Sequence, residues 1–248
     1  MNYKVEGKGP LLFLIPGLGG CSKSFEPLMP FLSRFQVIRF DPVGCGKSES
    51  FTKNTENLIL EGVVCLIKKI TKEKVNILGN SFGGVLARIL AVENPEIVNK
   101  VILVATEPNP ERVVSSKNVK PSVGKGASPK ERTQAWLKSF SSKDWETRDP
   151  LGFSNAVDYY SENEALAETQ RIQRNFVLEN SNLGLPEDLK KKTLIIHGDS
   201  DFLVPFENAQ IMNNLIQDSV LKKISCCGHM VVWEHPEFLG EAIEEFVF

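Results

Sequence analysis

The chain has 248 residues, of which 42% are hydrophobic and 24% charged, the ordinary balance of a globular protein with one full core. A net charge of −2 without a basic cluster argues against a nucleic-acid partner, and no apolar run approaches the ~20 residues that a membrane span needs. The N-terminus lacks the apolar segment of a signal peptide and the five cysteines follow no regular spacing, so we expect a cytoplasmic protein.

Short apolar segments alternate with helical patterns over the first part of the chain. The predicted strands are 11–15, 35–40, 75–78 and 100–105. The predicted helices are 55–70 and 82–94. Strands and helices alternate in this way in a mostly parallel, doubly wound α/β sheet.

The alternation stops at residue 107 and resumes near residue 187. A capping box with proline at the first helical position predicts a helix over 128–141, and a second helix is expected over 163–179 with Leu166, Ile172, Phe176 and Val177 on its apolar face. Roughly 80 residues are too many for a plain loop, so we predict a helical cap at 107–186 inserted into a core of 1–106 and 187–248. Most aromatic residues of the cap are expected to form its own small core, with one or two reaching a binding site.

The last part of the chain returns to the α/β pattern. Strands are predicted at 193–196 and 220–225, and helices at 207–216 and 236–246. The cysteine at position 226 is expected to end the last strand and face the core.

The sequence GNSFG at residues 79–83 matches G-x-S-x-G and lies between a predicted strand and a predicted helix. In this context a tight turn presents the serine hydroxyl away from the backbone, and the following helix directs free N–H groups toward developing negative charge. We therefore predict that Ser81 is a nucleophile. A serine needs a base to take its proton and a carboxylate to orient that base.

Two later segments supply such groups: HGDSDFLVP at 197–205 follows one predicted strand, and CGH at 227–229 follows the last. On these separated motifs the chain resembles the α/β-hydrolase superfamily from about residue 11 to its C-terminus. The resemblance implies that Asp201 is the acid and His229 the base. Asp199 is the alternative acid, although we expect it to accept hydrogen bonds from turn amides.

The chain has only three histidines, so the base can be compared with its alternatives. His197 ends a strand, where a structural role is the plain interpretation, and His235 precedes a proline at a helix start, where capping or surface exposure is expected. The family often begins with two antiparallel strands, but only about ten residues precede position 11 here. We therefore predict one short strand and a shortened sheet edge.

The resemblance also assigns an oxyanion hole to the backbone N–H groups of Leu18 and Phe82. Leu18 lies in the loop PGLGG at 16–20, which has proline where the family commonly has histidine. Residues 41–48 end in Gly-Lys-Ser but have Asp41 where a phosphate-binding loop needs glycine, so we interpret them as a structural turn. The cysteines near His229 lack the ligand spacing of a metal site, and neither a metal nor a cofactor is expected.

The elbow GNSFGG is similar to that of the meta-cleavage-product hydrolases, and small carboxylesterases and enol-lactonases are similar too. The resemblance implies a serine hydrolase acting on a small-molecule substrate, most simply a small to medium, largely apolar carboxylic ester or lactone. Carbon–carbon bond hydrolysis and a non-catalytic ligand-binding protein are the alternatives. The sequence does not predict the oligomeric state.

Overall fold

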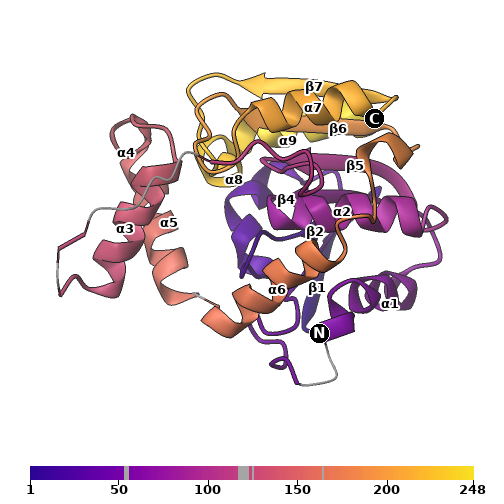
Figure 1. Ribbon diagram of the computed structural model, residues 1–248, viewed down its shortest axis with the longest axis horizontal. Coiled ribbons are helices and arrows are strands. Elements are labelled where there is room, and N and C mark those ends of the chain that lie inside the picture. Colours follow the sequence, from indigo (N-terminus) through magenta and orange to yellow (C-terminus); the bar gives the residue numbers. More distant parts are fainter. Residues whose placement is uncertain (53–55, 117–122, 125, 164) are drawn as a thin grey trace.

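The computed structural model describes residues 1–52, 56–116, 123–124, 126–163 and 165–248, and seven strands of this part form one sheet (Figure 1). The strands are β1 (Tyr3–Gly7), β2 (Leu11–Ile15), β3 (Gln36–Phe40), β4 (Val75–Asn80), β5 (Val98–Val104), β6 (Thr193–Gly198) and β7 (Ser219–Ile224). Their order across the sheet is β1-β3-β2-β4-β5-β6-β7, and only the β1–β3 pair is antiparallel. The predicted mostly parallel sheet is therefore confirmed.

The N-terminal edge has the single strand that the sequence predicts. β1 pairs with β3 from Tyr3 opposite Phe40 to Gly7 opposite Gln36. Since every residue of β1 is exposed, this strand closes the edge of the sheet and contributes little to the core.

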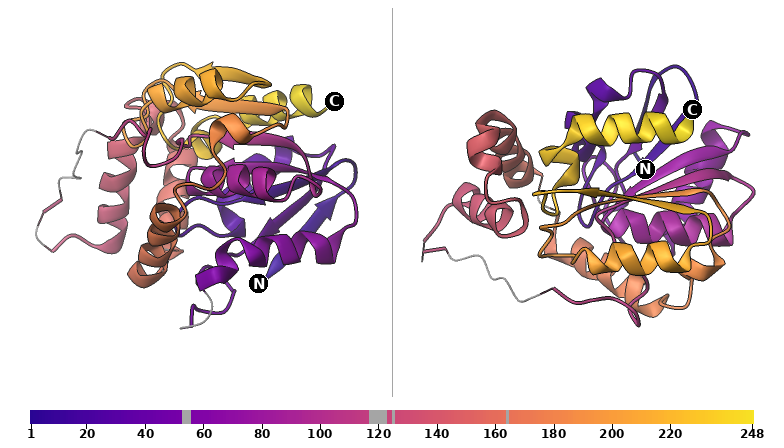
Figure 2. Two further views of the ribbon diagram at one scale, coloured as in Figure 1. Left: turned by 45° about the vertical axis from the view of Figure 1, so that its right-hand side comes forward. Right: turned by 90° about the horizontal axis from the view of Figure 1, so that it is seen from above.

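Helices cover both faces of the sheet, because successive side chains of each strand point to opposite sides. Leu12 and Leu14 belong to the hydrophobic cluster under η1 (Ser22–Phe31) and α9 (Pro236–Val247). Phe13 and Ile15 belong to the cluster under α1 (Glu61–Ile70), α2 (Phe82–Glu93) and α7 (Glu207–Leu215). The right-hand view of Figure 2 shows α9 on one side of the sheet and α2 and α7 on the other.

The first predicted helix, over 55–70, differs in detail, because a short 3-10 helix, η2 (Glu56–Ile59), precedes α1. Within the part of the chain that the structure describes, no helix has the length and apolar character needed to cross a membrane.

Helices also fill the segment between β5 and β6, with α3, α4 and α5 beside the sheet in Figure 1. These helices are α3 (Pro129–Phe140), α4 (Trp145–Arg148), α5 (Pro150–Glu162), α6 (Ala167–Glu179) and the 3-10 helix η3 (Pro186–Asp188). The predicted capping box of α3 is present, since the Ser128 hydroxyl accepts the Glu131 N–H and the Glu131 carboxylate accepts the Ser128 N–H.

The second predicted helix, over 163–179, begins too early. Residues up to Glu162 belong to α5, and α6 begins only at Ala167. Leu166 therefore precedes the helix and is 67% exposed, so its prediction as an apolar-face residue is wrong, whereas Ile172 is buried. The sequence does contain a signal for the start of α5, because Asp149 is its N-cap residue and Pro150 occupies its first position.

Candidate active site

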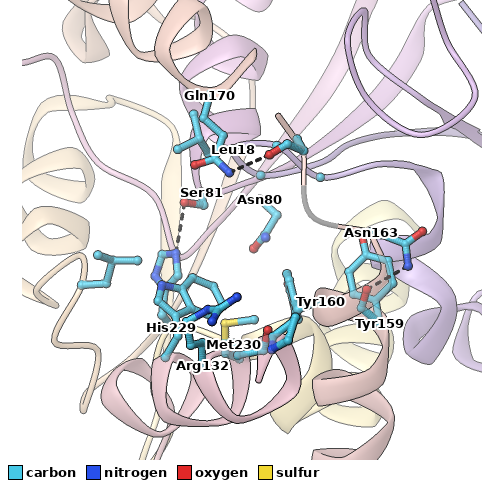
Figure 3. Close-up of a pocket in the computed structure, with 18 of the residues that line it drawn as sticks. Leu18, Asn80, Ser81, Arg132, Tyr159, Tyr160, Asn163, Gln170, His229 and Met230 are labelled. Atoms are coloured by element: carbon cyan, nitrogen blue, oxygen red, sulfur yellow. Dashed lines mark hydrogen bonds between the residues drawn. The ribbon is translucent and has the colours of Figure 1, made fainter. Parts of the chain in front are cut away.

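Ser81 occupies the turn between β4 and α2 in a strained conformation, with φ 53° and ψ −121°, a region that residues other than glycine rarely adopt. Its N–H donates to the Val104 carbonyl (2.8 Å), and its own carbonyl accepts the Thr106 hydroxyl (2.6 Å) and the Gly84 N–H (2.8 Å). These bonds fix the backbone so that the Ser81 side chain faces a cavity, as Figure 3 shows.

The glycines of the G-x-S-x-G motif allow the backbone to pack closely around Ser81. A Cβ atom on Gly79 would lie 2.2 Å from the Gly83 carbonyl oxygen, and one on Gly83 would lie 2.2 Å from that of Ile15. Both contacts are far inside van der Waals distance, so strand and helix can cross here only without side chains.

The three residues predicted to act together lie in one hydrogen-bonded row. His229 Nε2 is 3.1 Å from Ser81 Oγ, and His229 Nδ1 is 2.7 Å from Asp201 Oδ2. Asp201 follows β6 and His229 follows β7, so two loops at the carboxyl end of the sheet bring these side chains to the turn after β4. With the carboxylate accepting from Nδ1, Nε2 is free to accept the serine proton.

Asp201 is 4% exposed and is held in its charged form by its neighbours. Its Oδ1 accepts the N–H groups of Leu203 (2.9 Å) and Val204 (2.8 Å). Burial opposes ionisation of Asp201, but the charge of His229 and the hydrogen bonds from His197 and His229 outweigh it and lower the pKa to about 2. The carboxylate is thus an anion over the whole neutral range.

The His229 loop is fastened by Glu234, which ends the short helix α8 (Val231–Glu234) and is 6% exposed. Its carboxylate accepts the N–H groups of Gly228 (3.1 Å) and Met230 (3.2 Å), on either side of His229, and that of Ser142 (2.9 Å) after α3. Glu234 could not be predicted to lie here, because no local sequence pattern indicates that its side chain turns back to the loop before it.

The pKa of His229 is raised above its ordinary value of 6.5. Burial alone lowers the pKa of this imidazole, but the charge and hydrogen bond of Asp201 outweigh burial, and the charges of Glu107 and Glu234 add to them. Burial in turn raises the pKa of Glu107, against the charges of His229 and Arg88.

We predict from this shift how activity depends on pH. As the predicted base, His229 works only when neutral, so kcat/KM should rise with pH and level off above its pKa in the unliganded protein. Since the pKa is raised, the inflection should lie above 6.5. A pH–rate profile on an uncharged ester measures it, and an inflection at or below that value would contradict the prediction.

The N–H groups predicted to bind an oxyanion belong to the loop after β2 and to the start of α2. Leu18 lies in the loop after β2 and lines the same cavity, and Phe82 begins α2, where a helix leaves its first N–H groups unpaired. Among the described residues neither N–H has a hydrogen-bond partner, whereas the next one, of Gly19, donates to Gln173 Oε1 (2.7 Å).

The alternative candidates for acid and base have structural partners. Asp199 Oδ1 accepts the Cys226 N–H (2.8 Å), a turn amide as expected. His197 Nε2 donates to the Val204 carbonyl (2.8 Å) and lies 3.3 Å from Asp201 Oδ2, while His235 at the start of α9 contacts Arg148 and makes no side-chain cap. None of these side chains takes the place of Asp201 or His229 beside Ser81.

A cavity of about 710 Å³ lies next to Ser81 (Figure 3) and is lined in part by residues of α3, α5 and α6. Trp136, Tyr159 and Tyr160 line it, so three aromatic residues of the predicted cap reach the cavity rather than the one or two expected. The remaining aromatic residues of this segment pack in different places. Trp145 and Phe153 pack edge to face against each other, whereas Phe176 packs on the hydrophobic cluster under α2.

The loop at 41–48 is a structural turn, as predicted. Asp41 accepts the N–H groups of Ser22 (2.9 Å) and Lys47 (2.9 Å) and the side-chain amide of Asn2 (2.8 Å). The Asp41 carboxylate therefore occupies the position that a bound phosphate would need.

The prediction for Cys226 is wrong. Cys226 is exposed with φ 56°, because β7 ends at Ile224 and the chain turns, whereas Cys227 is fully buried. Burial raises the pKa of the Cys227 thiol, so it remains protonated and a poor nucleophile. Within the described ranges, no group of three or more histidine, cysteine, aspartate or glutamate side chains could hold a metal ion.

The fold is a mostly parallel α/β sheet with Ser81 at the turn between β4 and α2. The sequence profile of the alpha/beta hydrolase fold family matches residues 10–122 and 112–236, and the chain belongs to this family.

Individual relatives are similar over nearly the whole chain. A 2-hydroxy-6-oxo-6-(2'-aminophenyl)hexa-2,4-dienoic acid hydrolase from Metapseudomonas resinovorans is 28% identical, covering 99% of this chain and 87% of its own. The enol-lactonase of Burkholderia xenovorans superposes with a TM-score of 0.80 at 19% identity, covering 99% and 95%. A meta-cleavage product hydrolase from Pseudomonas fluorescens gives 0.75 at 23% identity, covering 99% and 93%. The sequence relatives support a hydrolase, and the two structures show the shared fold.

Proposed function

We propose that the protein is a serine hydrolase that cleaves small to medium, largely apolar carboxylic esters or lactones through an acyl-enzyme on Ser81. The observation that carries the proposal is the row in which Asp201 accepts from His229 Nδ1 (2.7 Å) and His229 Nε2 faces Ser81 Oγ (3.1 Å). The steps need no cofactor, because the chain supplies nucleophile, base, orienting carboxylate and oxyanion donors.

In the first half-reaction Ser81 Oγ attacks the substrate carbonyl carbon and its proton passes to His229 Nε2. The carbonyl oxygen becomes an oxyanion that the Leu18 and Phe82 N–H groups bind. Collapse of this intermediate breaks the ester bond, and the leaving alkoxide takes the proton from His229. Water then repeats the sequence on the acyl-enzyme, releasing the acid and restoring the Ser81 hydroxyl.

The walls of the cavity support a largely apolar acyl group. Leu18, Met230 and the rings of Trp136, Tyr159 and Tyr160 are among the side chains that line the cavity. A volume of about 710 Å³ is within the range of pockets for small molecules.

Carbon–carbon bond hydrolysis of the meta-cleavage type is a second candidate. The 28% identical relative from Metapseudomonas resinovorans is by name a hydrolase of a dienoic acid. Arg132 and Arg174 also line the cavity, and no carboxylate does so among the lining residues that the structure describes. A guanidinium group suits the carboxylate of such a substrate.

Two assays on the same preparation separate these candidates. Release of p-nitrophenol from acetate, butyrate and octanoate esters measures esterase activity, and loss of absorbance of a coloured 2-hydroxy-6-oxohexa-2,4-dienoate measures carbon–carbon cleavage. We expect the esters to be turned over and one serine-directed fluorophosphonate to attach at Ser81. Cleavage of the dienoate alone would replace the ester proposal, and inactivity in both assays would favour a ligand-binding protein.

A further inference from the structure

Gln173 is a buried polar side chain that the proposed chemistry does not use. It lies on α6 in the cap, is 1% exposed, and reaches the loop after β2. Because an N–H group can only donate, the atom facing Gly19 N is the amide oxygen, and the bond measures 2.7 Å. The Gln173 amide nitrogen points to the sulfur of Cys45 at 3.7 Å.

The hydrogen bond between Gln173 and Gly19 determines which N–H group of the loop remains free to bind an oxyanion. Leu18 and Gly19 are consecutive, and Gly19 has φ +68°, in the left-handed region that favours glycine. With the Gly19 N–H bound to Gln173, the loop has a fixed orientation in which the Leu18 N–H keeps no partner among the described residues. The loop has one further internal bond, from Gly20 N–H to the Gly17 carbonyl (2.9 Å).

We propose that Gln173 is a positioning residue that orients the Leu18 N–H toward the oxyanion from across the cap–core boundary. The inference rests on the proposed function, because it assumes that this N–H binds an oxyanion. Without Gln173 the buried Gly19 N–H would lack a partner, and unpaired buried donors are costly enough for a short loop to rearrange. The proposal makes a cap helix part of the support of the oxyanion hole.

The same helix faces the substrate cavity. Gln170 and Arg174, one turn apart on α6, line that cavity, while Gln173 turns toward the core. A substrate seated against α6 therefore contacts the element that holds the oxyanion loop.

Thr169 provides a matched control, because it lies one turn before Gln173 on α6 and is 3% exposed. Its hydroxyl donates to the Gly44 carbonyl (3.2 Å), in a different core loop. Thr169→Val thus removes a partly buried hydrogen bond between α6 and a core loop, in which the side chain is the donor, without touching the loop of Leu18.

The test compares Gln173→Met, Gln173→Glu and Thr169→Val in ester hydrolysis. Removing an oxyanion donor costs about 10²–10³-fold in kcat, so displacing one through Gln173→Met should lower kcat about 10- to 100-fold with KM changed less than about 3-fold. Gln173→Glu keeps an acceptor for the Gly19 N–H and should recover most of this loss. Thr169→Val should stay within about 3-fold of wild type.

A second readout separates transition-state from ground-state binding. Gln173→Met should weaken inhibition by a trifluoromethyl ketone, which forms an oxyanion on Ser81, in proportion to kcat/KM, while the product acid binds as in wild type. Unchanged kcat in Gln173→Met, or equal losses in Gln173→Met and Thr169→Val, would overturn the positioning role. Ser81→Ala in the same assay tests the proposed function separately, since its failure would appear as retained turnover in that variant.

Discussion

Ser81→Ala should lower kcat by about 10⁴-fold or more, the usual cost of removing the nucleophile of a triad. Two groups depend on this hydroxyl: the substrate carbonyl has no attacking atom without it, and His229 Nε2 loses its partner at 3.1 Å. Steady-state hydrolysis of the best p-nitrophenyl ester measures the loss, and mass spectrometry of the fluorophosphonate-treated protein should show label on wild type alone.

The fold should survive this change. Alanine and serine both carry a Cβ atom, so the cost of φ 53° at this turn is the same for both. The melting temperature should therefore stay within about 2–4 °C, which corresponds to about 1 kcal/mol in a chain of this size. Ser200→Ala is a suitable control, because that hydroxyl contacts Asp199 Oδ1 (3.1 Å) on the nearby acid loop. Turnover by Ser81→Ala within 100-fold of wild type would exclude the nucleophilic role.

The sheet and the row at Ser81 could be predicted because their signals are local. Apolar runs mark β2, β4 and β6, and each predicted side chain follows a strand within a short motif. Because parallel strands end at the same edge of the sheet, residues far apart in the sequence meet there. Ser81 and His229, for example, are separated by 148 positions.

The supporting contacts could not be predicted, because they join segments without a common pattern. Gln173 meets Gly19 across 154 residues, and Glu234 meets Ser142 across 92. A glutamine or glutamate on a short or polar helix is usually exposed, so its type and spacing indicate nothing about a buried role. The prediction for Cys226 is wrong for a different reason. The strand ends at Ile224 and the backbone turns to positive φ at Cys226, so the alternation of inward and outward side chains no longer applies there.

The two contacts join the helical segment between β5 and β6 to both loops of the proposed site. Gln173 on α6 accepts the Gly19 N–H in the loop of Leu18. At the other side, the Phe140 carbonyl at the end of α3 accepts the N–H of His229 (2.6 Å), and the Ser142 N–H just after α3 donates to Glu234. Two helices that line the cavity, α6 and α3, are thus hydrogen-bonded to the loop of Leu18 and to the loop of His229. On the proposed function, we therefore expect substitutions in this helical segment to change turnover as well as substrate choice.

Asp201→Asn should lower kcat about 10⁴-fold, the loss that the same exchange causes in a serine protease triad. An asparagine can still accept the Leu203 and Val204 N–H groups through its oxygen, which turns its NH₂ toward His229 Nδ1. Nδ1 must then act as the acceptor, so the imidazole proton moves to Nε2 and the ring can no longer take the proton of Ser81. Burst and steady-state kinetics with a p-nitrophenyl ester should show that acylation itself is slow.

Asp199→Asn is the matched control, two residues away on the same loop. Asparagine keeps an oxygen for the Cys226 N–H, and the contact that it loses, to Lys223 at 3.7 Å, is partly exposed and worth about 1 kcal/mol or less. Its kcat should stay within about 3-fold of wild type, with the fold intact in both variants. Equal losses in the two variants would mean that the loop's charge, rather than the orientation of His229, governs turnover. A loss confined to Asp201→Asn identifies the carboxylate that bonds Nδ1 as the group that sets the tautomer of the base.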